Sequence, residues 1–246
     1  MAKGNDIIED NVKKITRPKS SRAKKVEIES IDEPIIVNST NEALNNQPPI
    51  LKTDWFLSEM ETQEQWCFAS NVFTNEELDQ IIATGENPEL SCPMAEGTVY
   101  GKNNGVRSCQ VSWINSGLPE NSWIFQRLTK AVLDINSKFF GFDLKVLDSL
   151  QFTKYVGSTD DHYGKHCDML YKSFTTRKLS FSLLLSNPED YQGGDLLIHS
   201  GERPDVPEKT RGNIVFFPSY ALHEVTPVTS GVRYSLVGWC SGPPFK

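Results

Sequence analysis

The chain has 246 residues, a formal net charge of −7, 38% hydrophobic residues and 23% charged residues. This composition can bury a core, which excludes a wholly disordered acidic protein, and the negative balance disfavours a nucleic-acid binder that uses a general basic surface. No apolar run approaches the roughly 20 residues of a membrane span, no apolar signal peptide follows Met1, and the cysteines form no C-x-x-C pair, so we expect a cytoplasmic protein without disulfides or a zinc ribbon.

Residues 1–52 differ from the rest of the chain. Basic residues from Lys13 to Lys25 occur without an acid, and a short acidic stretch and an Asn/Gln/Pro-rich segment follow. The segment lacks a sustained apolar period, so we expect a disordered, charged tail. A docking arm for an acidic partner or a nucleic acid is the alternative interpretation. The ordered domain is expected over residues 53–246.

Two helices are predicted at the start of this domain. Thr74 and Glu77 form a capping-box pattern, and we expect the helix that they begin to end at Gly85. A second helix is expected from Ser122 to Phe139, because its apolar residues recur at helical spacing and Gly141 follows.

Strands dominate the remainder of the chain. Short apolar or alternating runs are bounded by Gly, Pro, Asn or Asp. They cover residues 107–114, 150–156, 179–185, 196–199, 214–217 and 234–240. Helices that precede a cluster of strands favour a β-sandwich or barrel with helices packed outside it over a βαβ parallel sheet.

A metal site is indicated by His166, Asp168 and His223. The chain has only four histidines, and one of them lies in the sequence His166-Cys167-Asp168. On a strand, residues i and i+2 point to the same face, so the imidazole and the carboxylate can converge while the cysteine points away. Two histidines and one carboxylate form a facial triad that suits a ferrous ion with open coordination positions.

A buried anion site is indicated by Arg233. Because Ser235, Val237 and Trp239 share its strand face, the guanidinium should point into the β-core, where it needs an anion. A guanidinium suits a carboxylate, and Ser235 can add a hydroxyl donor. A metal on one side and a carboxylate anchor on the other describe a site for a bidentate keto acid.

Together these residues amount to a family resemblance. The stretch from Arg107 to Phe245 resembles the iron(II)/2-oxoglutarate dioxygenases, and within them the prolyl 4-hydroxylase-like branch. The segments that carry this resemblance are H-x-D with its distal His and Arg, Gly193-Gly194-Asp195-Leu196, Val215-Phe216-Phe217-Pro218 and Gly231-Val232-Arg233-Tyr234-Ser235-Leu236. Arg233, where animal and algal enzymes usually have Lys, is similar to the bacterial and viral type. The resemblance implies a double-stranded β-helix (jelly-roll) core.

The resemblance also implies roles for individual residues. His166, Asp168 and His223 match the iron ligands, and Arg233 matches the residue that binds the far carboxylate of 2-oxoglutarate. Tyr155 resembles a tyrosine that supports the same carboxylate. The family positions that surround a substrate proline are matched here by Tyr163, Arg177 and Trp239.

The implied reaction is hydroxylation of a prolyl residue in a peptide or protein, with release of succinate and CO2. Its cofactors are Fe(2+), 2-oxoglutarate and O2, with ascorbate as a candidate reductant. The alternatives are an oxygenase that acts on a nucleic-acid base or on a small molecule, and a non-catalytic β-helix binding module. In the branch that acts on nucleic acids, the distal His is followed by the motif R-x-x-x-x-x-R. This chain resembles that motif only at Arg233, because Trp239 replaces the second Arg, which counts against a nucleic-acid substrate. An intact triad disfavours the binding module.

Overall fold

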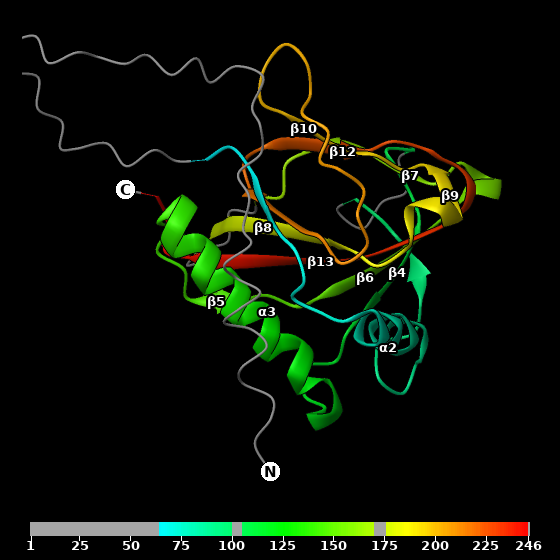
Figure 1. Cartoon of the computed structure of the whole chain (residues 1–246), viewed down its shortest axis with the longest axis horizontal. Helices are drawn as coiled ribbons and strands as arrows, with labels where there is room; N and C mark the ends of the chain where they lie inside the picture. The colour runs from blue at the N-terminus through cyan, green and yellow to red at the C-terminus, as the bar shows by residue number, and fades with distance from the viewer. Residues whose placement is uncertain (1–63, 100–104, 170–175, 246) are drawn as a thin grey trace, which may run out of the picture. The chain divides into compact units, whose positions relative to one another are not determined.

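The computed structural model describes residues 64–99, 105–169 and 176–245. The predicted tail, residues 1–52, lies outside this part of the chain, as does the start of the predicted domain up to residue 63. The described residues form antiparallel strands in two sheets with two α-helices beside them (Figure 1). This arrangement confirms the prediction of a mainly β fold with flanking helices. No helix among the described residues is long and apolar enough to cross a membrane.

The first described helix, α2 (Asn75–Glu86), begins as the sequence predicts. The Thr74 side chain accepts a hydrogen bond from the Glu77 backbone N–H, and the Glu77 carboxylate accepts one from the Thr74 N–H at 2.8 Å. The predicted end at Gly85 is wrong, because the helix continues one residue further. Gly85 is needed for packing instead, since a Cβ there would lie 2.3 Å from Cγ of the Phe152 ring.

The second helix, α3 (Ser122–Ile135), continues through one π-helical turn (Asn136–Phe140). Gly141 follows in the left-handed conformation, with φ of 64°, and its N–H donates to the Asn136 carbonyl. The predicted terminator is therefore confirmed, because glycine adopts this conformation without a steric penalty.

The larger sheet is antiparallel and is built around the longest strand, β13. Its strand order is β1 (Cys67–Ala69), β11 (Ile214–Pro218), β8 (Thr176–Leu184), β13 (Val228–Gly242), β6 (Gln151–Val156), β4 (Gln110–Trp113) and β2 (Ala95–Glu96), while β5 (Val146–Leu147) and β9 (Tyr191–Gly193) also pair with β13. Short 3₁₀ turns occur at Pro119–Asn121, Gly157–Thr159 and Pro188–Asp190. Five of the predicted strands therefore contribute to this sheet, one of them, residues 107–114, only through β4.

The smaller sheet has the order β10 (Leu196–His199), β12 (Leu222–Val225), β7 (His162–His166) and β3 (Arg107–Ser108). In Figure 1, β10, β12 and β7 lie above β8, β13 and β6 of the larger sheet. The predicted strand over residues 107–114 is divided between the two sheets, because the chain leaves β3 and enters β4 at Cys109.

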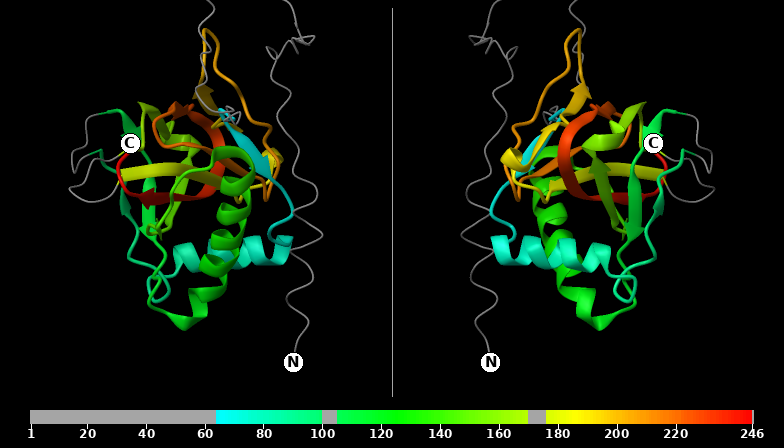
Figure 2. Two further views of the ribbon diagram at one scale, coloured as in Figure 1. Left: turned by 90° about the vertical axis from the view of Figure 1, so that its left-hand side faces the viewer. Right: turned by 90° about the vertical axis from the view of Figure 1, so that its right-hand side faces the viewer.

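The main hydrophobic core lies between the larger sheet and the helices, which cover one side of that sheet (Figure 2). It joins Leu78 and Ile124 of the helices to Phe152, Phe181 and Leu236 of the strands. Full burial of each such side chain contributes about 1.5–3 kcal/mol. Side chains alternate between the two faces of a strand, so the opposite face of β13 and β6 is directed away from this core. Polar residues occupy that opposite face, and they build the site.

Candidate active site and metal centre

Two neighbouring strands bring the predicted metal ligands together. In the antiparallel pair of β7 and β12, His166 lies opposite His223, and their ring centroids are 4.1 Å apart. Asp168 follows β7 by two residues, and its backbone N–H donates to the Ser219 carbonyl at 2.9 Å. Ligand atoms of the two histidines and the aspartate lie within 4.8 Å of one another. We call these three residues the His-Asp-His cluster.

Backbone carbonyls fix both imidazoles. Nδ1 of His166 lies 2.8 Å from the Gly164 carbonyl, and Nδ1 of His223 lies 2.9 Å from the Ala221 carbonyl. A carbonyl can only accept a hydrogen bond, so each Nδ1 donates a proton to it and Nε2 is the nitrogen that remains for a metal. The two Nε2 atoms lie 3.6 and 3.5 Å from the oxygens of Asp168. Three ligand atoms thus face one point.

This donor set fits a ferrous ion. The Asp168 Oδ2 atom is buried without a hydrogen-bond partner, although an unpaired buried carboxylate oxygen is costly. Burial, together with the neighbouring His223, lowers the pKa of His166 to about 4, which keeps the imidazole neutral and able to bind a metal. Two imidazole nitrogens and one carboxylate suit iron(II) with open coordination positions.

An arginine that the sequence analysis did not assign to the site supports the cluster from one side. The Tyr163 ring stacks on the His166 imidazole, with centroids 3.5 Å apart and planes 12° apart. The Arg107 guanidinium lies 4.5 Å from the centroid of the same tyrosine ring. It also donates to Gln151 Oε1 at 2.9 Å and to Cys109 Sγ at 3.0 Å. Tyr163 therefore contacts a metal-ligand candidate directly.

Arg233 is buried without a counter-ion among the described residues. Cross-strand pairing places it opposite Tyr155 and places Ser235 opposite Thr153. Its side chain is 3% exposed, one of its terminal nitrogens donates to Ser235 Oγ at 3.1 Å, and its Cζ lies 5.3 Å from the Tyr155 ring centroid. Nε has no hydrogen-bond partner, and no described carboxylate forms an ion pair with the group. A buried cation in this state is suited to binding an anion.

The predicted substrate residues lie in the same cavity as the cluster. This cavity has a volume of about 650 Å³, and its wall includes His166, Asp168, His223, Thr153, Tyr155, Tyr163, Arg177 and Trp239. The Arg177 Cζ lies 4.1 Å from the Trp239 ring centroid, and its Nε donates to Asp148 at 3.1 Å. Arg177 lies within β8, not before a strand as predicted, because β8 begins at Thr176.

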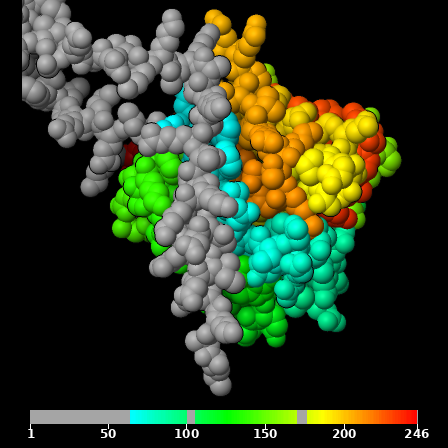
Figure 3. Space-filling model, viewed as in Figure 1, coloured from blue at the N-terminus to red at the C-terminus, as the bar shows by residue number. Residues whose placement is uncertain are grey.

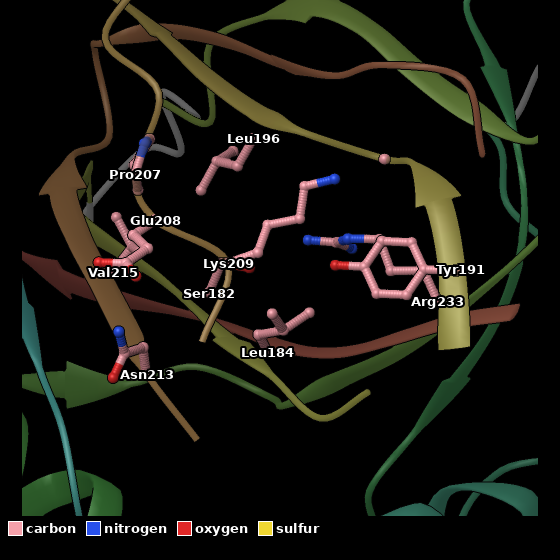
Figure 4. Close-up of a pocket in the computed structure, with 11 residues that line it drawn as sticks. Ser182, Leu184, Tyr191, Leu196, Pro207, Glu208, Lys209, Asn213, Val215 and Arg233 are labelled. Carbon is pink, nitrogen blue, oxygen red and sulfur yellow. The ribbon is translucent and has the colours of Figure 1, made fainter. Parts of the chain in front are cut away.

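A smaller cavity of about 30 Å³ adjoins the first, since Ser182 and Leu196 line both. Arg233 lines it, together with Tyr191 and Lys209, whose polar ends lie near the guanidinium in Figure 4. The volume exceeds the roughly 10–15 Å³ that one water molecule needs, so a small polar group can fit there.

Unpartnered buried polar atoms gather at these cavities. Among the described residues, the buried side-chain atoms without a hydrogen-bond partner are Thr153 Oγ1, Asp168 Oδ2, Tyr191 OH, Arg233 Nε and Trp239 Nε1. Each of the five residues lines one of the two cavities. Native proteins pair almost all buried polar groups, so atoms left unpaired in a cavity are suited to ligands.

The other histidines lie outside the cluster: His199 pairs with Glu224 at 2.8 Å, and His162 contacts the Asp160 and Gly105 carbonyls. Sequence reasoning missed Arg107, Thr153 and Tyr191. The only sequence signal for Thr153 was its position in the predicted strand over residues 150–156. No local sequence pattern indicated that Arg107 or Tyr191 belongs to the site.

Comparison with known proteins links this geometry to a family. The family model described as "2OG-Fe(II) oxygenase superfamily" matches residues 150–241, a range that contains the cluster and Arg233. A PKHD-type hydroxylase of Crocosphaera subtropica is 31% identical over 170 residues, which cover 66% of this chain and 76% of that protein. Another, from Prochlorococcus marinus, is 38% identical over 113 residues, which cover 46% of this chain and 50% of that protein.

Solved structures show the same fold. A prolyl-4-hydroxylase of Pseudomonas putida has a TM-score of 0.58 at 22% identity and covers 72% of this chain and 92% of its own. A prolyl hydroxylase of Trichoplax adhaerens, solved with a hypoxia-inducible-factor peptide fragment, has a TM-score of 0.60 at 16% identity and covers 72% of this chain and 83% of its own. The predicted double-stranded β-helix core is thereby confirmed.

Proposed function

This chain belongs to the 2OG-Fe(II) oxygenase superfamily, and we propose that it hydroxylates a prolyl residue of a peptide or protein. It is a dioxygenase dependent on 2-oxoglutarate and iron(II). The observation that carries the proposal is the single cavity that contains the His-Asp-His cluster and a wall formed by Tyr163, Arg177 and Trp239. Curated relatives named PKHD-type hydroxylases support it.

We assign the ligands as follows. His166, Asp168 and His223 hold the metal, and Arg233 with Ser235 binds the far carboxylate of 2-oxoglutarate. We also assign Tyr155, whose ring lies beside the guanidinium, to support that carboxylate, the role that the family resemblance implies. When bound, iron, 2-oxoglutarate and O2 supply the oxidation that places one oxygen atom on a substrate C–H bond, with formation of succinate and CO2.

The protein contributes the positions of the reacting groups. Hydrogen bonds from each Nδ1 to a carbonyl hold the two imidazoles with Nε2 directed at the metal position. The buried guanidinium orients a dicarboxylate, because its planar fork matches a carboxylate group. These contacts are made before substrate arrives, so little reorganisation is needed.

The wall of the cavity favours a prolyl substrate. A compact apolar ring can pack on Trp239 and Tyr163, while a guanidinium can donate to a neighbouring peptide carbonyl. Arg177 is held over Trp239 and by Asp148, so its position is fixed in advance. A flipped base would instead need stacking contacts and partners for its hydrogen-bonding edge.

The test is a substrate screen with product analysis. The iron-loaded protein is incubated with 2-oxoglutarate, with and without ascorbate, and with proline-containing peptides, methylated nucleotides or small amino acids. We expect succinate formation coupled to the gain of one oxygen atom on a peptide proline. The Asp168→Asn variant should lose this activity, while Asp134→Asn, a change of a helix aspartate paired with Lys138, should keep it.

Coupled hydroxylation of a nucleotide or free small molecule, with no peptide product, would contradict the prolyl proposal and favour one of the alternatives. Equal succinate formation by the Asp168→Asn variant would contradict the assignment of the metal site.

A further inference from the structure

A second donor lies beside Arg233 in the smaller cavity. We propose that the Tyr191 hydroxyl donates a hydrogen bond to the far carboxylate of 2-oxoglutarate and so helps the enzyme to select a dicarboxylate. This inference rests on the proposed function, since it takes the Arg233 guanidinium as the anchor for that carboxylate.

The position of Tyr191 is set by β9, which pairs with β13 and places Tyr191 opposite Gly231. The tyrosine side chain is 4% exposed, and its hydroxyl has no hydrogen-bond partner. Figure 4 shows the hydroxyl and the Arg233 guanidinium directed into the same cavity. No described protein group pairs with this hydroxyl, so it is available to a ligand that enters the cavity.

Gly194 allows the two side chains to lie together. It adopts a left-handed conformation with φ of 62°. A Cβ at this position would lie 2.8 Å from Cδ of Arg233 and 3.2 Å from Cε2 of Tyr191. Both side chains therefore pack against the bare glycine backbone, and a larger residue would force them apart. The Gly193-Gly194 pair noted in the sequence thus shapes the anion site.

The charges in this cavity suit one carboxylate. Lys209 Nζ lies 5.1 Å from the Tyr191 ring centroid, but it is already paired with Asp195 at 2.9 Å and with the Gly193 carbonyl at 2.6 Å. Its segment, orange in Figure 3, is fixed beside α2 by the ion pair of Arg211 with Asp79. Glu208 also lines this cavity, but it is exposed and forms no ion pair with Arg233. Arg233 therefore has no ion-pair partner among the described residues, and a neutral donor such as Tyr191 adds a hydrogen bond without adding charge.

Tyr191 and Tyr155 approach the far carboxylate from different cavities. Tyr155 lines the larger cavity with the His-Asp-His cluster, whereas Tyr191 lines the smaller cavity, to which no residue of that cluster contributes. The far carboxylate is the end of 2-oxoglutarate that is remote from the metal. The Tyr191 hydroxyl is therefore better placed for that end than for the keto acid group at the metal.

The test compares two keto acids that differ only at the far end. Dissociation constants of 2-oxoglutarate and 2-oxopentanoate, which lacks the far carboxylate, are measured by calorimetry on full-length, manganese-loaded protein without oxygen. For Tyr191→Phe we expect about tenfold weaker binding of 2-oxoglutarate, the value for one hydrogen bond to a charged group, and unchanged binding of 2-oxopentanoate. Tyr234→Phe is the matched control, because that hydroxyl bonds Glu86 outside the cavities.

Equal weakening of both acids, or of neither, would overturn the proposal, because a contact to the far carboxylate affects only the dicarboxylate. A melting temperature measured without ligand shows whether the variant is folded. The Arg233→Met variant distinguishes a failure of the Tyr191 inference from a failure of the proposed function. If it loses the preference for 2-oxoglutarate while Tyr191→Phe keeps it, the inference about Tyr191 alone fails; if wild type shows no preference, the proposed function fails.

Discussion

Replacement of Arg233 by methionine should stabilise the protein without its co-substrate and weaken co-substrate binding. The guanidinium is 3% exposed, makes a single side-chain hydrogen bond to Ser235 and leaves Nε unpaired. An unsatisfied buried polar group costs about 1–3 kcal/mol, and a buried charge without a partner costs at least as much. Methionine has a similar length and no charge, so we expect the free energy of unfolding to rise by about 1–3 kcal/mol.

Binding should change in the opposite direction. A charge-assisted hydrogen bond to a buried carboxylate is worth about 1.5–3 kcal/mol, so loss of the guanidinium should weaken 2-oxoglutarate binding by roughly one to two decades. At a ligand concentration of about 100 Kd, wild type should gain about 2.7 kcal/mol of stability from the co-substrate. The variant should lose most of that gain.

Urea denaturation of manganese-loaded protein, with and without 2-oxoglutarate, measures both effects. Arg203→Met is the matched control, since Arg203 is exposed and lies outside both cavities. If Arg233→Met lowers the unfolding free energy without ligand, the guanidinium is part of the structural framework and the reasoning is refuted. Unchanged stabilisation by 2-oxoglutarate would refute the anchor assignment.

Three further predictions concern the surroundings of the site. Asp148→Asn should raise KM for a peptide substrate about threefold to tenfold and leave peptide-independent succinate formation unchanged. The variant frees Arg177 from its ion pair, and repositioning the guanidinium on the substrate costs about 1 kcal/mol. A KM equal to that of wild type would contradict a role of Arg177 in substrate binding. Gly85→Ala should lower the free energy of unfolding by about 1–3 kcal/mol in thermal denaturation, since the clash with an aromatic ring exceeds the gain of about 1 kcal/mol in helix propensity, and a rise would show that the core relaxes. Burial raises the pKa of the Cys240 thiol to about 12, so iodoacetamide at pH 8 should modify the exposed Cys92 first, as peptide mass spectrometry would show; equal rates would contradict the described burial.

Local patterns predicted the features that depend on neighbouring residues. The capping box of Thr74 and Glu77 depends on three-residue spacing, so the sequence alone located the start of α2. Gly141 ends its helix because glycine adopts the left-handed backbone conformation without a steric penalty, and this preference can be recognised from the sequence alone. Gly85 misled the same reasoning, because its function is to admit the Phe152 ring from a distant strand. Propensity cannot detect such a contact.

The sequence predicted the residues of the metal cluster and the convergence of His166 with Asp168, but it did not predict the strand register that brings His223 to them. Pairing of His166 with His223 depends on the register of β7 and β12, strands that the sequence analysis did not predict. Arg107 and Tyr191 were missed because they reach the site only through tertiary contacts. Arg107 begins a strand that was predicted as continuous but is divided between two sheets, and Tyr191 follows a turn without periodicity.

The strand β13 fixes the distance between two side chains of the site, Arg233 and Trp239. The two residues lie six positions apart on one continuous strand. At about 3.4 Å per residue, their Cα atoms are about 20 Å apart. The strand β6 pairs with β13 from Val232 to Val237 and β8 pairs with it from Ser235 onward, so the middle of this stretch is paired on both sides. The anion anchor and the aromatic wall therefore cannot shift independently, and insertion of one residue between them would turn one of the two side chains to the wrong face. Evolution of a longer co-substrate site or a wider substrate site in this scaffold must therefore proceed through the flanking loops.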